Sequence, residues 1–276
     1  MTKLRARFLR AVLAVELRRR VRSRRSAWLL SGYLAVMGAV MLGYLYVSTG
    51  PNVVSATSRE LFYLLSTLQL VMVLFLTPAV AAGTISGERE RQTLHVLLTT
   101  NLTAAEIVVG KLVSSLSFLV LLVVASLPLY AIVFVYGGVS PALLTAAFAF
   151  FLFTMAVVGS FSVLASALCR RTSAAMVTSY AAVGAMVIGT ALLAQFVRLW
   201  WERFHPSAPP AGGFWGDGIL AFNPVWSLWS MFSFREEPVG GLPLPPVALY
   251  VLGYGVLALA ALATASIAVG RARVEG

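Results

Sequence analysis

The stretch LVSSLSFLVLLVVASLPLYAIVFVYGGVSPALLTAAFAFFLFTMAVVGSFSVLASALC, residues 112–169, decides the fold because it contains no Asp, Glu, Lys or Arg. A helix rises about 1.5 Å per residue, so about 20 apolar residues cross a hydrocarbon layer of about 30 Å. The stretch is long enough for two crossings, and the residues from Gly137 to Pro141 are typical of a turn between them. We predict membrane spans at about 107–136, with a kink at Pro128, and at about 142–168.

Charge-free runs of similar length occupy most of the remaining chain. Only 11% of the residues are charged, against about 25% in an ordinary soluble domain, and 59% are hydrophobic. So few charges cannot cover a water-facing surface, which excludes a soluble protein. We predict an all-α membrane protein with six transmembrane helices. The transmembrane domain covers 27–270, and its spans lie at about 27–47, 61–85, 107–136, 142–168, 174–197 and 247–269.

Basic residues are distributed unevenly over the two sides that six spans define. All but four of the 21 Lys and Arg residues lie in the N-terminal segment 1–26, the loop 86–106 with Lys111, the hinge 169–173 or the tail 271–276. Positively charged loops stay in the cytoplasm. We therefore expect both termini to be cytoplasmic, in a bacterial or archaeal inner membrane, and the loop 198–246 to be external.

The N-terminal segment 1–26 has an amphipathic pattern. Its apolar residues recur at helical spacing while arginines take the other side: Leu4, Phe8, Val12 and Val15. This pattern predicts a helix lying on the membrane, and an unstructured basic tail is the alternative. The net charge of +11 would also suit nucleic acid, but its concentration before the first span fits an anionic membrane surface. We expect membrane lipids, and no nucleic acid, as partners.

The one strongly polar internal stretch, residues 86–106, contains a second amphipathic pattern. An acidic and basic start, Glu88 to Arg91, precedes leucines on one helical face: Leu94, Leu97 and Leu98. Further on, Thr103 and Glu106 have the spacing of a capping box, which predicts the start of the next helix. A short cytosolic helix with an apolar face either lies back on the bilayer or inserts into a groove on a partner protein.

The predicted external loop 198–246 contains an apolar segment, residues 219–234, that is too short to span a membrane and too apolar for water. Trp226 and Trp229 in this segment suit the headgroup level of a membrane. We expect a short re-entrant or interfacial helix here. The alternative is an aromatic belt that only anchors the loop.

Residues for catalysis or metal binding are few and scattered. Cys169 is the only cysteine, and His95 and His205 are far apart in the sequence, so neither a disulfide nor a metal site is predicted. No catalytic motif occurs, and we predict no enzyme activity and no bound cofactor. The spans carry neutral polar groups such as Gln69 and Gln195, whereas ion-coupled carriers and channels place charges near the midplane.

The polar loop and its flanks resemble a segment typical of ABC-2 type permeases, the membrane subunits of ATP-binding cassette transporters. The resemblance lies in the order and spacing of Pro78, Ile85, Glu88-Arg89-Glu90, Thr93-Leu94, Leu97-Leu98, Thr100, Leu102-Thr103, Glu106-Ile107 and Gly110-Lys111. The chain departs from the family pattern at Gln92, where the family prefers Gly, and at Asn101, where it prefers Pro. Weaker similarities lie at Val15–Leu17 with Arg22–Arg25, at Ser166–Tyr180 and at Asn223-Pro224.

The resemblance implies roles for three groups of residues. An N-terminal elbow helix would contain Glu16, Arg18 and Arg22. A re-entrant segment that caps the translocation path on the outside would contain Asn223, Pro224, Trp226 and Trp229. A coupling helix at about 91–99 would dock on an ATPase subunit, and the residues of this coupling site would be Glu88, Arg89, Glu90, Arg91, Thr93, Leu94, Leu97 and Leu98.

The resemblance also implies partners: two copies of an ABC ATPase subunit, and a second permease as a homodimer or as a heterodimer with a close relative. The chain's only Gly-Lys pair, Gly110-Lys111, has Ala105 and Leu112 where a phosphate loop needs Gly and Ser or Thr, so ATP and Mg²⁺ would bind in the partner ATPase. Because no span supplies an interior charge, we expect export of an amphipathic or apolar substrate. The alternatives are an ion-coupled carrier or channel and a non-transporting membrane scaffold.

Overall fold

A computed structural model of the chain describes residues 24–48, 54–92, 103–135, 139–205, 217–232 and 244–274. Within these ranges the chain forms helices and turns and no strand, as predicted for an all-α protein. Two predicted elements lie outside the described residues. They are the elbow helix with Glu16, Arg18 and Arg22, and the part of the coupling helix with Thr93, Leu94, Leu97 and Leu98.

Six helical stretches among the described residues are long and apolar enough to cross a membrane, which confirms the predicted number of spans. In chain order they are α2 (Arg24–Ser48); α3 (Val54–Ala81) followed by the short α4 (Ser86–Glu90); α6 (Ala104–Ala125) with α7 (Leu127–Val135); α8 (Pro141–Leu168); α9 (Thr172–Gly184), which continues through the π-helical η1 (Ala185–Gly189) into α10 (Thr190–Phe204); and α13 (Pro246–Val274). Two short helices, α11 (Asp217–Leu220) and α12 (Pro224–Phe232), lie between the fifth and sixth spans.

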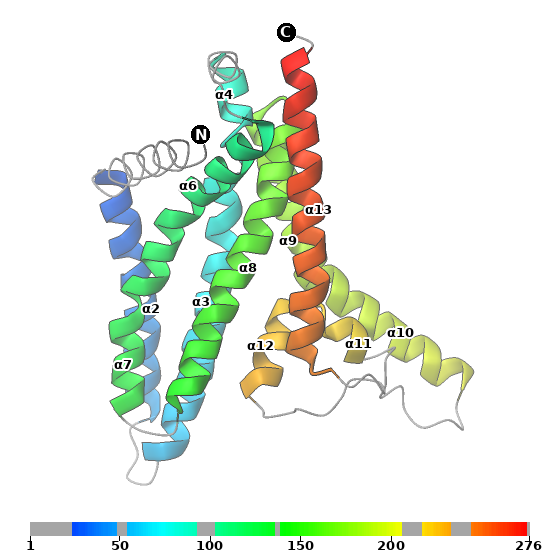
Figure 1. The fold of residues 1–276 in the computed structure, drawn as a ribbon. Coiled ribbons are helices and arrows are strands. Elements are labelled where there is room, and N and C mark those ends of the chain that lie inside the picture. The colour runs from blue at the N-terminus through cyan, green and yellow to red at the C-terminus, as the bar shows by residue number, and fades with distance from the viewer. Residues whose placement is uncertain are drawn as a thin grey trace.

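Helix α8 is the central element of the bundle. It packs against α3, α6, α9 and α13, and it lies between α6 and α13 in Figure 1. Gly159 sets its distance to α6, because a Cβ at this position would lie 2.9 Å from side-chain atoms of Leu112 and Leu116. Small residues allow such close approach of membrane helices, which gain their stability largely from packing.

Local side-chain caps explain where two spans begin. The capping box predicted for the third span is confirmed: Thr103 Oγ1 accepts from the Glu106 amide at 3.3 Å, and Glu106 Oε2 accepts from the Thr103 amide at 2.7 Å. The fourth span begins after Ser140, whose Oγ accepts from the Leu143 amide at 3.2 Å. Both caps satisfy amides that have no partner within the helix.

The two prolines within spans act differently. Helix α3 continues through Pro78 to Ala81. The third span, by contrast, divides into α6 and α7 just before Pro128. Proline lacks an N–H and its ring clashes with the carbonyl four residues earlier, which here belongs to Val124. Ser126 lies at the break, and its hydroxyl donates to the carbonyl of Val123 at 2.7 Å.

The fifth span is longer than the sequence suggests. Its helix runs on to Phe204 rather than ending near Val197, and α10 diverges from the rest of the bundle (Figure 1). Arg198, which marked the start of the predicted external loop, lies within α10 and forms an ion pair with Asp217 of α11 at 2.6 Å. A charged residue with such a partner does not require the helix to end.

The two ends of the bundle differ. The start of α2, the end of α13 and α4 lie at one end, and α11 and α12 lie at the other (Figure 1). This arrangement follows from six crossings. It separates the polar loop after α3 from the tryptophan-bearing segment before α13.

Candidate functional site

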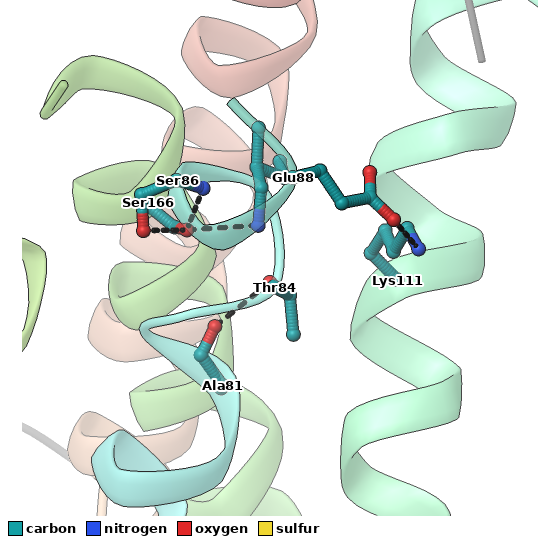
Figure 2. A network of polar contacts seen from close by, with 7 residues as sticks. Ala81, Thr84, Ser86, Glu88, Lys111 and Ser166 are labelled. Carbon is teal, nitrogen blue, oxygen red and sulfur yellow. Dashed lines mark hydrogen bonds and ion pairs between the residues drawn. The ribbon is translucent and has the colours of Figure 1, made fainter. Parts of the chain in front are cut away.

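The polar loop begins with α4, which packs against the junction of α8 and α9. Ser166, in the last turn of α8, is fully buried, and its Oγ accepts hydrogen bonds from the amides of Ile85 at 3.0 Å and Ser86 at 2.9 Å (Figure 2). The first amides of a helix have no partner within it. Ser166 therefore caps α4 from a neighbouring span.

An ion pair connects α4 to the third span. Glu88 Oε1 lies against Nζ of Lys111 in α6, and the two carry opposite charges (Figure 2). Both side chains are mostly buried, with exposed fractions of 25% and 20%. Water and salt screen such a pair less than a fully exposed one. The contact therefore joins the start of the loop to α6.

Arg89 binds the C-terminal end of α8. Its Nη2 donates to the carbonyl of Ala167 at 3.2 Å, and its Nη1 donates to the carbonyl of Cys169 at 3.4 Å. The last carbonyls of a helix lack partners within it and carry partial negative charge. The guanidinium group of Arg89 donates hydrogen bonds to these carbonyls and places a positive charge beside them, so Arg89 acts as a cap for α8.

Glu90 binds the N-terminal end of α9. Its Oε1 accepts from the Thr172 amide at 2.8 Å, and its Oε2 accepts from the Thr172 hydroxyl at 2.8 Å. A carboxylate is favourable at this helix end, where the amides carry partial positive charge. The backbone approaches closely here, because a Cβ on Gly83 would lie 3.2 Å from Cγ2 of Thr172.

Three consecutive residues of the motif thus contact three different helices: Glu88 contacts α6, Arg89 contacts α8 and Glu90 contacts α9. Sequence reasoning placed these residues in the coupling site. The structure shows that their side chains bind the permease itself, and their contact with an ATPase stays a prediction. Arg91, the fourth residue, is exposed at the end of α4.

The opposite end of the bundle contains the four residues expected in the re-entrant segment. Asn223 precedes α12, and its Oδ1 accepts from the amides of Val225 at 2.9 Å and Trp226 at 3.3 Å. Its Nδ2 donates to the carbonyl of Val187 in η1 at 2.7 Å and to Thr190 Oγ1 at 3.0 Å. One side chain therefore caps α12 and fastens it to the π-helical segment of the fifth span.

The remaining residues of this group lie along α12. Pro224 is buried at its first position, where a missing N–H costs nothing. Trp226 is half-buried, and Trp229 is 50% exposed with its Nε1 donating to Thr67 Oγ1 in α3 at 2.9 Å. Helix α12 therefore packs on the spans through fixed contacts, and its depth in the membrane stays a prediction.

Sequence reasoning did not single out the partners of the motif. Ser166 and Thr172 lie in the segment quoted for its resemblance, yet their pairing with α4 joins residues about 80 positions apart. The partner of Glu88 was easier to predict from the sequence, because Lys111 lies at the same membrane boundary and carries the opposite charge. Within the described ranges, no cluster of three or more His, Cys, Asp and Glu side chains could hold a metal ion.

These observations define a class of protein: a multi-pass α-helical membrane protein in which the spans themselves hold the start of a polar loop. The sequence profile of the family described as ABC-2 family transporter protein matches residues 10–202. The chain therefore belongs to the ABC-2 family of transporter proteins, as a membrane permease subunit of an ABC transporter. No curated protein sequence matches the chain.

Proposed function

We propose that the chain is an exporter permease in which α4 conveys the movement of a separate ATPase to the membrane spans. The observation that supports this proposal is the set of contacts made by Glu88, Arg89 and Glu90 with α6, α8 and α9. Helix α4 also follows α3 directly in the chain. A displacement of α4 therefore acts on four spans together.

The proposed partner is an ABC ATPase subunit, in two copies, that binds ATP and Mg²⁺ and docks on the loop 86–106. Leu94, Leu97 and Leu98 are proposed to enter a groove on this partner. The loop would then lie in the cytoplasm with both termini, at the bacterial or archaeal cell membrane, which agrees with the concentration of basic residues on that side. Two permease chains, identical or closely related, would form the path between them.

The proposed cargo is an amphipathic or apolar molecule, exported outward. The polar side chains buried inside the described spans are neutral, including Gln69, Thr77 and Thr154. A strongly charged solute would lose its hydration there without gaining a partner, which is costly in an apolar medium.

Replacement of Leu97 by Asp tests the proposed docking. We expect the L97D permease to insert and fold normally but to lose copurification with its ATPase and the ATP hydrolysis that substrate stimulates, because the groove would bury an unpaired charge. The matched control is T99D, which adds the same charge on the opposite side of the predicted helix. Undiminished copurification and hydrolysis in L97D would instead favour a helix that lies on the bilayer.

A further inference from the structure

A cavity of about 450 Å³ lies between α3 and α12, at the end of the bundle opposite α4. Its volume falls within the usual range for small-molecule sites, about 300–1,000 Å³. One wall is rigid: the rings of Tyr63 and Phe232 are stacked with centroids 4.9 Å apart, and the Tyr63 hydroxyl donates to the Phe232 carbonyl at 3.0 Å. The described residues that line the cavity are Glu60, Tyr63, Leu64, Thr67, Trp229 and Phe232.

A third aromatic side chain of the lining, Trp229, is held in place while remaining accessible. Trp229 is 50% exposed, and the hydrogen bond from its Nε1 to Thr67 fixes the orientation of the indole ring. An exposed indole in a fixed orientation presents a flat, electron-rich face at low entropic cost. Such faces attract cations, and tryptophan does so more strongly than tyrosine or phenylalanine.

Among the described residues that line the cavity, Glu60 alone carries a charge. Its Oε2 accepts a hydrogen bond from the Tyr44 hydroxyl of α2 at 2.5 Å, which holds the carboxylate in position. The neighbouring Arg59 is exposed and does not line the cavity. An apolar aromatic cavity with one positioned carboxylate is complementary to a cation attached to an apolar body, and it disfavours an anion.

We propose that this cavity binds an amphipathic organic cation, with its ammonium or similar group near Glu60 and its apolar part against Trp229, Leu64 and Phe232. This inference rests on the proposed export of amphipathic molecules and narrows that class by charge. The same ammonium chemistry is available from a soluble amphiphile and from a choline lipid headgroup.

Equilibrium binding to the purified full-length permease in maltoside micelles tests the site without any ATPase. The probes are tetraphenylphosphonium and tetraphenylborate, which are matched in shape and opposite in charge, with empty micelles as the blank. We expect the cation to bind with at least about tenfold higher affinity than the anion, and E60Q to remove that preference. The matched control is E202Q, which removes an exposed carboxylate on α10, outside the cavity lining.

Two further arms complete the test. E60D keeps the charge and should restore most of the preference for the cation, which separates loss of charge from loss of fold. Competition by added phosphatidylcholine but not phosphatidylglycerol would support the site with a lipid headgroup as its ligand, whereas no competition by either would support it with a soluble amphiphile. Equal binding of the two probes to the unmodified permease, or an undiminished preference in E60Q, would overturn the proposal. Neither result would bear on ATPase docking, which L97D tests separately.

Discussion

Gln92, the second residue after α4, has a left-handed backbone with φ of 57°. This conformation is costly for residues other than glycine, by roughly 1–2 kcal/mol. The family that the sequence resembles prefers glycine at this position. The structure thus gives a physical reason for that preference, because the residue at this position adopts a left-handed backbone conformation where the chain leaves α4.

Replacement of Gln92 by glycine should therefore stabilise the permease slightly. We expect Q92G to raise the midpoint of thermal unfolding, followed by tryptophan fluorescence in detergent, because the relieved strain exceeds the added freedom of the unfolded chain. R91G is the matched control: Arg91 has an ordinary φ of −82°, so glycine there should lower the midpoint. Equal losses in both variants would show that Gln92 is not strained.

At the scale of the element, the fifth span contains a π-helical turn, Ala185–Gly189. A π-helical turn leaves backbone groups of a helix without their usual partners, and such turns often occur at functional sites. Here the Val187 carbonyl receives its hydrogen bond from Asn223, a residue outside the span. One amide side chain therefore joins the π-helical turn of the fifth span to the start of α12.

Variants of Asn223 should separate its two contacts. N223A removes both the cap of α12 and the donor to Val187, and should lower the unfolding midpoint by the equivalent of about 1–3 kcal/mol. N223S keeps an acceptor for the cap and loses the donor to Val187, so its loss should be intermediate. An unfolding midpoint of N223S equal to that of the unmodified permease would show that the contact with η1 contributes nothing.

Some of these elements could be predicted from the sequence and others could not. Charge-free runs predicted the spans because the bilayer imposes a length and a polarity on each helix, and the Thr103 and Glu106 pattern predicted a cap because its contacts are local. The π-helical turn in Ala185–Gly189 has no comparable local signal. The contacts of Arg89 and Glu90 depend on where α8 and α9 pack, so tertiary structure alone determines them.

At the scale of the whole molecule, the topology is the most direct prediction. In a C169S background, which removes the only cysteine, we expect H205C to react with a membrane-impermeant maleimide in intact cells. S173C, near α4, should react only after the membrane is permeabilised, because positively charged loops are retained in the cytoplasm. Reaction of S173C in intact cells would reverse the orientation, and equal reaction of both residues would contradict the six crossings.

Helix α3 reaches both ends of the bundle. It supplies Glu60, Tyr63 and Thr67 to the cavity, and after Ala81 it leads through one turn into α4. Helix α3 therefore connects the proposed cargo site to the loop on which the ATPase is proposed to dock. Pro78, which lacks a backbone N–H, interrupts the hydrogen bonding of this helix between the two sites. Thermodynamic linkage is reciprocal: if docking at α4 changes the affinity of the cavity by some factor, an occupied cavity must change the affinity for the docked partner by the same factor. Through α3, bound cargo would change the affinity for the ATPase, and docking of the ATPase would change the affinity for cargo.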